Sequence, residues 1–144
     1  MGIAGTRCAR LIFDRIGRAG HSPARFHAEE REVDRVTTRE EALNYGLTFQ
    51  DVYQDVPFHD DNWILVRSRK NKKAFLWTYE YQGQVRINVK VEPEWRDFWR
   101  NTYKSVIPGY HQNKEHWNTV ILDGSVPDED VKRMIAESYD LVTG

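Results

Sequence analysis

The most informative stretch of the chain is residues 108–127, with the sequence PGYHQNKEHWNTVILDGSVP. Its opening Pro-Gly pair predicts a tight turn, because proline presets φ and glycine tolerates positive φ. An irregular or helical segment dense in hydrogen-bond donors and aromatic rings comes next. The run WNTVIL at 117–122 predicts a strand, since it is rich in β-branched and apolar residues. The closing SVPD predicts a helix start, with proline in the first turn and acids near the positive end of the helix.

A β-hairpin is predicted upstream, where residues 74–81 and 84–91 flank Gln82-Gly83. A two-residue turn pairs Tyr81 with Gln84 and Trp77 with Asn88. One face of the hairpin then suits a core; it carries Ala74, Leu76, Thr78, Val85, Ile87, Val89 and Val91. The other face interleaves aromatic with polar and basic side chains; it carries Phe75, Trp77, Tyr79, Tyr81, Gln84, Arg86, Asn88 and Lys90.

Two interpretations of the second face stay open. Aromatic rings interleaved with cations are typical of a surface on which nucleic-acid bases stack. Alternatively, a helix covers the rings and the long polar side chains extend past it to water.

Helices are predicted on either side of this hairpin. Thr38 and Glu41 form a capping box for a helix that ends near Gly46, with Leu43 and Leu47 pointing inward. Residues 48–62 are predicted as an acidic loop and 63–67 as a strand. A helix begins at Glu92-Pro93, and an apolar stripe at helical spacing predicts that it docks on the sheet; the stripe consists of Trp95, Phe98, Trp99 and Thr102.

The last predicted helix spans about 127–139. Its apolar and small residues recur at helical spacing and predict its buried face; they are Val131, Met134, Ile135, Ser138 and Tyr139. Its acidic residues are expected to face water.

These motifs together resemble those of the MmcQ/YjbR-like family, over roughly Thr37–Val142. The resemblance rests on PGYHxNKxHWNTV from Pro108, on LDGSVPD after it, and on YQDVPFHDDNW at 53–63, Lys72-Lys73 and INVKVEPEW at 87–95. It implies a small α+β domain, an antiparallel sheet packed against helices, of CyaY or secretion-chaperone type. Members of the family are described as DNA-binding proteins with a "double wing" motif, so the resemblance also implies DNA as a partner.

Length and composition predict a single soluble domain, outside the membrane, and the resemblance places it in residues 37–144. We expect a monomer or weak homodimer. No apolar run approaches the ~20 residues that a membrane span needs. The single cysteine, Cys8, excludes an internal disulfide and a cysteine zinc cluster and favours a reducing, cytoplasmic compartment.

Residues 1–36 differ from the rest of the chain, because all seven of their basic residues are arginine. Two interpretations fit: an arginine-rich targeting segment, or an extension outside the fold that follows from a start site assigned too far upstream. We favour the second, and the intact mass of the protein made from its native gene tests it.

Charge is unevenly distributed although the net charge is only −1. Residues 63–120 carry 11 basic and 5 acidic groups, while residues 37–62 carry 1 and 6. Such a basic block is typical of polyanion binding. Acidic helices that neutralise basic strands would explain it equally well.

The densest basic segment is the turn around 68–73, which suits a wing that contacts phosphates. A soluble hairpin tip is the alternative. The predicted nucleic-acid contacts are Arg67, Arg69, Lys70, Lys72, Lys73, Arg86, Lys90, Tyr110, His111, Asn113 and Lys114.

His111 and His116 are the best candidates for catalysis or metal binding, with Asp123 nearby in sequence. Their spacing does not place both rings on one helix face, and a third ligand is unassigned. No nucleophile elbow or glycine-rich phosphate loop is present. We therefore expect a DNA-binding protein without enzymatic activity, cofactor or metal. The alternatives are a protein-interaction or chaperone-like module and a small-ligand activity at the two histidines.

Overall fold

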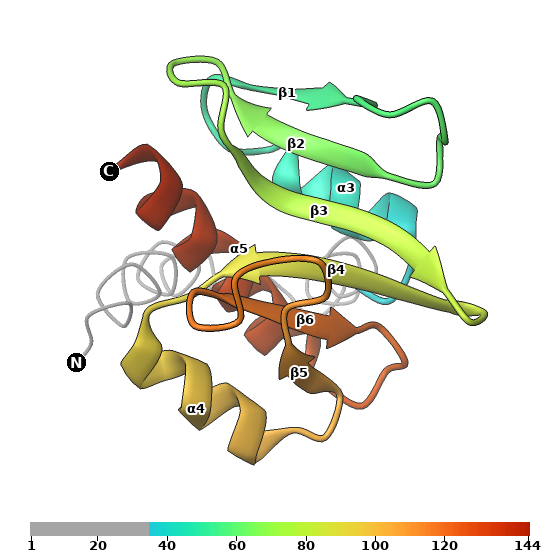
Figure 1. Ribbon diagram of the computed structural model, residues 1–144, viewed down its shortest axis with the longest axis vertical. Helices are drawn as coiled ribbons and strands as arrows, with labels where there is room; N and C mark the ends of the chain where they lie inside the picture. Colours follow the sequence, from blue (N-terminus) through green and yellow to red (C-terminus); the bar gives the residue numbers. More distant parts are fainter. Residues whose placement is uncertain (1–34) are drawn as a thin grey trace, which may run out of the picture. The chain divides into compact units, whose positions relative to one another are not determined.

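The computed structural model describes residues 35–144, in which Val36–Gly144 form one compact unit (Figure 1). The prediction for residues 1–36 falls almost wholly outside the described residues. Val36 is the exception: it is buried, and its amide donates to Asp128 Oδ1 over 3.2 Å. Val36 is therefore part of the described core.

Six strands form one antiparallel sheet in the order β1-β2-β3-β4-β6-β5. The strands are β1 (Val52–Asp55), β2 (Ile64–Ser68), β3 (Ala74–Tyr81), β4 (Gln84–Lys90), β5 (Val106–Pro108) and β6 (Trp117–Ile121). The helices are α3 (Arg39–Gly46), α4 (Pro93–Thr102) and α5 (Asp128–Thr143). The predicted α+β class is confirmed.

The β3–β4 hairpin has the predicted register, with Tyr81 opposite Gln84 and Trp77 opposite Asn88. Gln82 and Gly83 both have positive φ, of 54° and 77°. Two successive residues with positive φ make the turn whose twist matches the flanking strands.

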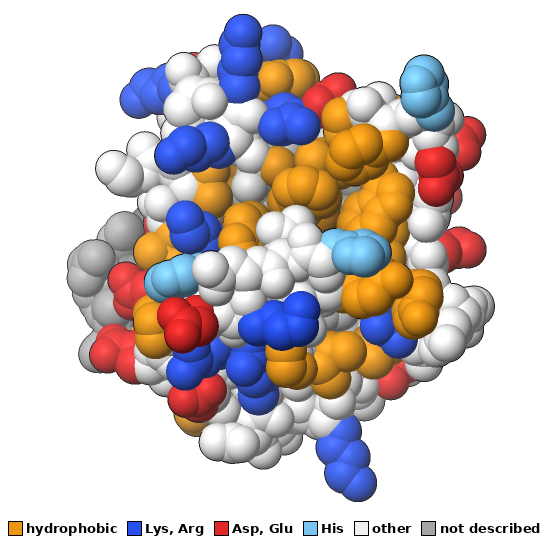
Figure 2. All heavy atoms as spheres, in the orientation of Figure 1, with side chains coloured by type: hydrophobic (Ala, Val, Ile, Leu, Met, Phe, Trp, Pro, Cys, Tyr) orange, Lys and Arg blue, Asp and Glu red, His pale blue; other side chains and the backbone are white. Residues whose placement is uncertain are grey.

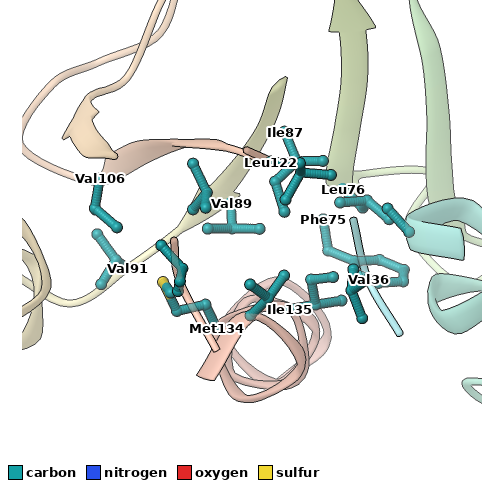
Figure 3. Packing of buried hydrophobic residues seen from close by; sticks show 14 of the residues in the cluster. Val36, Phe75, Leu76, Ile87, Val89, Val91, Val106, Leu122, Met134 and Ile135 are labelled. Carbon is teal, nitrogen blue, oxygen red and sulfur yellow. The ribbon is translucent and has the colours of Figure 1, made fainter. Parts of the chain in front are cut away.

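Helices α3 and α5 pack against one face of the sheet, which we call the inner face. There, strand side chains such as Leu76, Ile87 and Val89 meet Met134 and Ile135 of α5 in the hydrophobic core (Figure 3). The opposite face, turned toward the viewer in Figure 1, is the outer face. Because the helices occupy the inner face, the outer face is left for function.

Phe75 lies in the core rather than on the outer face, so its predicted placement was wrong. The β2–β3 register shifts between Val66 and Arg67, so that β3 holds one extra residue at this point. Because a bulge inserts one extra residue, strict alternation along the strand no longer predicts the face on which that residue lies. The Phe75 ring is fully buried against Phe49 and Tyr139.

The first helix has its predicted capping box, in which Thr38 accepts from the Glu41 amide and the Glu41 side chain accepts from the Thr38 amide. Leu43 is buried as expected. Leu47 was predicted to point inward but is exposed, because the helix ends at Gly46 and Leu47 is already its C-cap.

Two short strands were not predicted. Val52–Asp55 was assigned to a loop but pairs with β2 at one edge of the sheet, and Val106–Pro108 pairs with β6 at the other. Pro108 therefore ends a strand and does not open the predicted tight turn; the chain turns at Tyr110 and His111 instead.

Helix α4 is buried less than its apolar stripe predicted. Trp99 is buried, but Trp95 is only half-buried, Phe98 is 49% exposed and Thr102 is exposed. The helix packs against β5 and β6 at one edge of the sheet, so only part of its apolar stripe is covered.

The last helix extends to Thr143, four residues beyond its predicted end. Its predicted inward residues are buried or, for Tyr139, packed against the core. One of its acids, Glu137, was expected to face water and is buried instead. No helix among residues 35–144 has the length and apolar character needed to cross a membrane.

Candidate nucleic-acid interface

Seven aromatic side chains meet on the outer face and form what we call the aromatic cluster: Trp63, Trp77, Tyr79, Tyr81, Tyr110, His111 and Trp117. Trp63 stacks on Tyr79 with 4.3 Å between ring centroids, and Tyr79 stacks on Tyr110 at 5.7 Å. Tyr79 is buried, while Trp63, Trp77 and Tyr110 are half-buried. The cluster thus has a buried base and partly exposed rings above it.

The β5–β6 loop, residues 109–116, lies over the outer face and covers Tyr79. Neither sequence interpretation of this face anticipated that a loop, rather than a helix or a ligand, occupies part of it. Figure 1 shows the loop in front of β4.

A buried hydrogen-bond network joins the loop to the sheet. Asn88 Oδ1 accepts from Tyr79 Oη at 2.9 Å and from Thr119 Oγ1 at 2.6 Å, and Asn88 Nδ2 donates to the Tyr110 carbonyl at 2.8 Å. The Tyr110 amide donates to Thr119 Oγ1 at 2.9 Å. Burial raises the pKa of Tyr79, so its hydroxyl remains a neutral donor.

The loop also bonds to itself and to α4. Lys114 Nζ donates to the Gly109 carbonyl at 3.0 Å, and Asn113 Oδ1 accepts from the Glu115 amide at 2.8 Å. Arg100 donates to the carbonyls of Lys114 and Trp117 and, from Nε, to Asn118 Oδ1. Two predicted contact residues, Asn113 and Lys114, therefore have structural roles in the loop.

Gly109 is required by close packing. A Cβ at this position would lie 2.8 Å from Trp117 Cβ and 2.9 Å from the Trp117 carbonyl oxygen. Real Cβ atoms do not approach neighbours so closely, so only glycine fits.

His111 is an exposed member of the aromatic cluster. Its φ is 61°, an uncommon value outside glycine, and its ring lies 4.1 Å from Tyr110 and 6.2 Å from Trp63. His116 is exposed at the far end of the loop. Among residues 35–144, no three histidine, cysteine, aspartate or glutamate side chains gather closely enough to hold a metal ion.

The β2–β3 turn, residues 68–73, is the basic turn. Lys70, Lys72 and Lys73 are exposed, and none forms an ion pair within the part of the chain that the structure describes. Asn71 Nδ2 donates to the Val142 carbonyl at 2.9 Å and so fixes the turn to the end of α5. The turn therefore presents three unneutralised lysines from a defined backbone.

The two arginines near this turn differ from the lysines. Arg67 Nε bonds Asp55 Oδ2 at 2.6 Å, and its Nη1 donates to the Lys72 carbonyl at 2.8 Å. The Arg69 guanidinium lies 5.2 Å from the ring centroid of Tyr53. Arg67 thus stabilises the turn, while Arg69 keeps its charge exposed beside a ring.

Arg86 was predicted to contact nucleic acid from the sheet surface but is only 8% exposed. Its guanidinium lies 4.9 Å from the Tyr81 ring centroid, and Nη2 donates to Gln84 Oε1 at 3.1 Å. Its Nε has no hydrogen-bond partner, and no carboxylate among the described residues pairs with it. Its positive charge therefore acts on the outer face from beneath the rings.

Charged side chains are unevenly distributed around the aromatic cluster. In Figure 2, hydrophobic side chains gather on the upper part of the outer face, with Lys and Arg beside them on the side of the basic turn and acids both along the opposite margin and at the lower left. The loop between β1 and β2 contributes acids to the opposite margin, because Asp60 and Asp61 are exposed there. Lys90, half-buried on β4 opposite Trp117, adds a cation on the outer face.

Comparison with known proteins gives the family. The family model described as YjbR matches residues 47–141. The chain belongs to the YjbR family. The predicted resemblance is therefore confirmed.

Relatives of this YjbR-family chain come from several bacteria. It is 31% identical to the protein YjbR of Escherichia coli (strain K12), over 71% of this chain and 84% of that one. It is 36% identical to YyaQ of Bacillus subtilis (strain 168), over 72% of this chain and 97% of the relative. None of these names states an activity.

The fold is also shared with a solved structure. A crystal structure of a Deinococcus radiodurans protein, described as a DUF419 domain, matches with a TM-score of 0.69 and 31% identity. The match covers 74% of this chain and 79% of that one. The YjbR-family fold described above is therefore present in an independently solved protein.

Much of the PGYHxNKxHWNTV run of this YjbR-family domain consists of structural residues. Sequence reasoning identified the run but missed Trp63 and Tyr53, which contribute rings to the outer face. Alternation along β2 places Trp63 on the same face as Leu65 and Arg67, and this pattern was the available signal.

Proposed function

We propose that this domain is a non-enzymatic DNA-binding protein that binds through its outer face. The observation that carries the proposal is the basic turn, whose three exposed lysines are unpaired within residues 35–144. A phosphate backbone is the partner that such a cluster suits, because each contact releases counterions from the nucleic acid. A DNA partner also agrees with the cytoplasmic location that the sequence predicts.

Electrostatics supports the same face. Arg69 adds positive charge beside the basic turn, Arg86 beneath the rings of the aromatic cluster and Lys90 on β4. Exposed acids lie along the margin opposite the basic turn and at the lower left of the face (Figure 2). The net charge of −1 does not oppose this, since the local potential governs encounter with a polyanion.

The test is fluorescence anisotropy of labelled DNA, titrated with the full chain at low and at physiological salt. Lys70→Glu, Lys72→Glu and Lys73→Glu combined should weaken binding to every sequence and reduce the salt slope by about three, roughly one per lysine. Lys104→Glu is the matched control, because Lys104 is an exposed lysine outside this face. If the triple variant binds like the parent protein, or no DNA binds at low salt, the proposal is wrong.

A protein-interaction module is the second candidate, and exposed rings favour it. Phe58, which contacts Trp63 of the aromatic cluster, is 49% exposed, and Tyr81 of the cluster is 36% exposed. In that case charge reversal in the basic turn should have little effect on binding, whereas Trp77→Ala should abolish it.

A further inference from the structure

We propose that the aromatic cluster stacks on unpaired bases, so that the partner of this domain is a single polynucleotide strand rather than a duplex. This inference rests on the proposed function and specifies its ligand. It uses a feature that duplex binding through the basic turn leaves unexplained, namely the partly exposed rings beside that turn.

The rings form a connected surface. Phe58 contacts Trp63 edge to face at 6.4 Å, Trp63 meets Trp77 at 6.2 Å, and Trp77 meets Trp117 at 6.4 Å. Phe58 and Trp63 lie in the loop before β2, Trp77 lies on β3 and Trp117 on β6, so the rings extend across the middle of the sheet. Stacking on successive aromatic rings is the usual way that sheet proteins bind unpaired bases.

Two buried donors of the outer face lack acceptors. Trp77 Nε1 and Arg86 Nε are both buried without a hydrogen-bond partner, and both belong to the outer face. Arg86 is more than nine-tenths buried among Tyr79, Tyr81 and Tyr110, with no carboxylate beside it in the described residues. A cation held beneath aromatic rings favours an anionic ligand that also offers flat rings and acceptor atoms.

Charge complementarity selects a nucleic acid over an apolar protein segment. Trp63 immediately precedes β2 and lies four residues from Arg67, which corresponds to about 13 Å at the usual rise of a strand. If the bases of a polynucleotide stack on the aromatic cluster, its phosphates a few nucleotides away would therefore reach the basic turn. The acidic margin at the other end would repel phosphates, which gives the bound strand one preferred direction of exit.

The accessibility of the base faces distinguishes a single strand from a duplex as the ligand. In a duplex the faces of the bases are stacked on one another, and only their edges and the phosphates are accessible. The described part of the outer face has no protruding helix to enter a groove; it is formed by strands, the basic turn and the β5–β6 loop. The rings therefore suit bases whose faces are free.

The experiment compares four labelled probes with the full chain: oligo(dT), oligo(rU), a DNA duplex of the same length, and an abasic deoxyribose-phosphate strand. We expect oligo(dT) or oligo(rU) to bind at least tenfold more tightly than the duplex and the abasic strand. A tenfold difference in affinity corresponds to the stacking of about one base on an aromatic ring, which the duplex and the abasic strand cannot provide. The first two probes separate DNA from RNA. Binding should also quench tryptophan fluorescence.

Substitutions in the aromatic cluster test whether the bases contact its rings. Trp63→Ala should weaken oligo(dT) binding about tenfold, and Trp63→Phe, which keeps a ring, should restore most of it. His111→Gly removes an exposed ring and suits the φ of 61°, so it tests the cluster without loss of fold. Trp95→Ala is the control, because Trp95 is half-buried on α4 outside the cluster.

The outcomes separate the two proposals. Equal binding of duplex, abasic and intact single strands, lost with the lysine triple variant, overturns base stacking and leaves DNA binding by the basic turn intact. No binding to any probe at low salt overturns both and leaves protein docking as the use of the rings.

Discussion

The side-chain amide of Asn88 donates to the main-chain carbonyl of Tyr110 over 2.8 Å, with the Asn88 side chain fully buried. This bond joins the middle of β4 to the β5–β6 loop, 22 residues away in sequence. Because Asn88 Oδ1 also accepts from Tyr79 and Thr119, one side chain orders both the loop and the base of the aromatic cluster.

Asn88→Ala should destabilise the domain by about 2–4 kcal/mol, since it leaves two buried hydroxyls and a carbonyl without their partner. Urea unfolding followed by tryptophan fluorescence measures the change. Asn101→Ala is the control, because Asn101 is exposed on α4 and should change stability by less than about 0.5 kcal/mol. Equal effects of the two substitutions would show that the network contributes nothing.

Gly109→Ala should destabilise the domain by about 1–3 kcal/mol, because the added methyl group would overlap with Trp117. Gly83→Ala is an informative comparison: no atom lies within 4 Å of its added Cβ, so its cost of about 1 kcal/mol comes from the φ of 77° alone. Thermal unfolding of both variants checks the order. A Gly109 variant as stable as the parent protein would contradict the contact.

Lys72→Gly should raise stability by about 0.5–1 kcal/mol over Lys72→Ala, because Lys72 has a φ of 64° that glycine adopts without strain. Both variants remove the same cation, so any nucleic-acid affinity should fall equally in the two. Denaturant unfolding and anisotropy on the same preparations separate strain from charge. A lower stability for the glycine variant would rule out the strain.

Glu137 should make stability depend on pH. Burial raises the pKa of its carboxyl to about 7 from 4.5, opposed by Arg133 and assisted by Glu92 and Asp140. The folded protein therefore holds a proton that the unfolded chain has released, and stability falls as pH rises from about 4.5 to about 7. The loss should be about 1–3 kcal/mol, since the side chain keeps some solvent contact.

Glu137→Gln should remove this dependence and be the more stable form above about pH 7, with little difference below pH 4.5. Unfolding by urea across this pH range measures it. Glu129→Gln, at an exposed site on the same helix, controls for a general effect of net charge. A parallel pH profile for parent and Glu137→Gln would contradict the buried carboxyl.

The parts of the fold that could be predicted depend on local signals. Gln82-Gly83 and strict alternation determine the β3–β4 register, and Thr38 with Glu41 determines the start of α3. Strand β1 has only two strong β-formers, Val52 and Tyr53, among acidic neighbours, so its pairing with β2 depends on the tertiary fold.

The sequence predicted which residues share the face of the candidate site but not how deeply each of them is buried. Sequence alternation placed Arg86 and Tyr79 on one face, and the register confirms this. Their burial depends on the β5–β6 loop, which Arg100 holds by donating to the carbonyls of Lys114 and Trp117. Asn118 Oδ1 accepts from Arg100 Nε and orients that guanidinium. Side-chain bonds to distant carbonyls leave no spacing pattern in the sequence. The bulge at Phe75 likewise leaves no spacing pattern in the sequence.

The two edges of the sheet bear on how the protein behaves at high concentration. At one edge β5 is three residues long and ends in Pro108, which has no amide to donate; at the other, β1 is four residues long and follows Asp51, whose φ is 64°. Short, proline-ended or distorted edges are poor templates for strand addition. Concentrated samples should therefore resist fibril growth, even with aromatic rings exposed on the outer face.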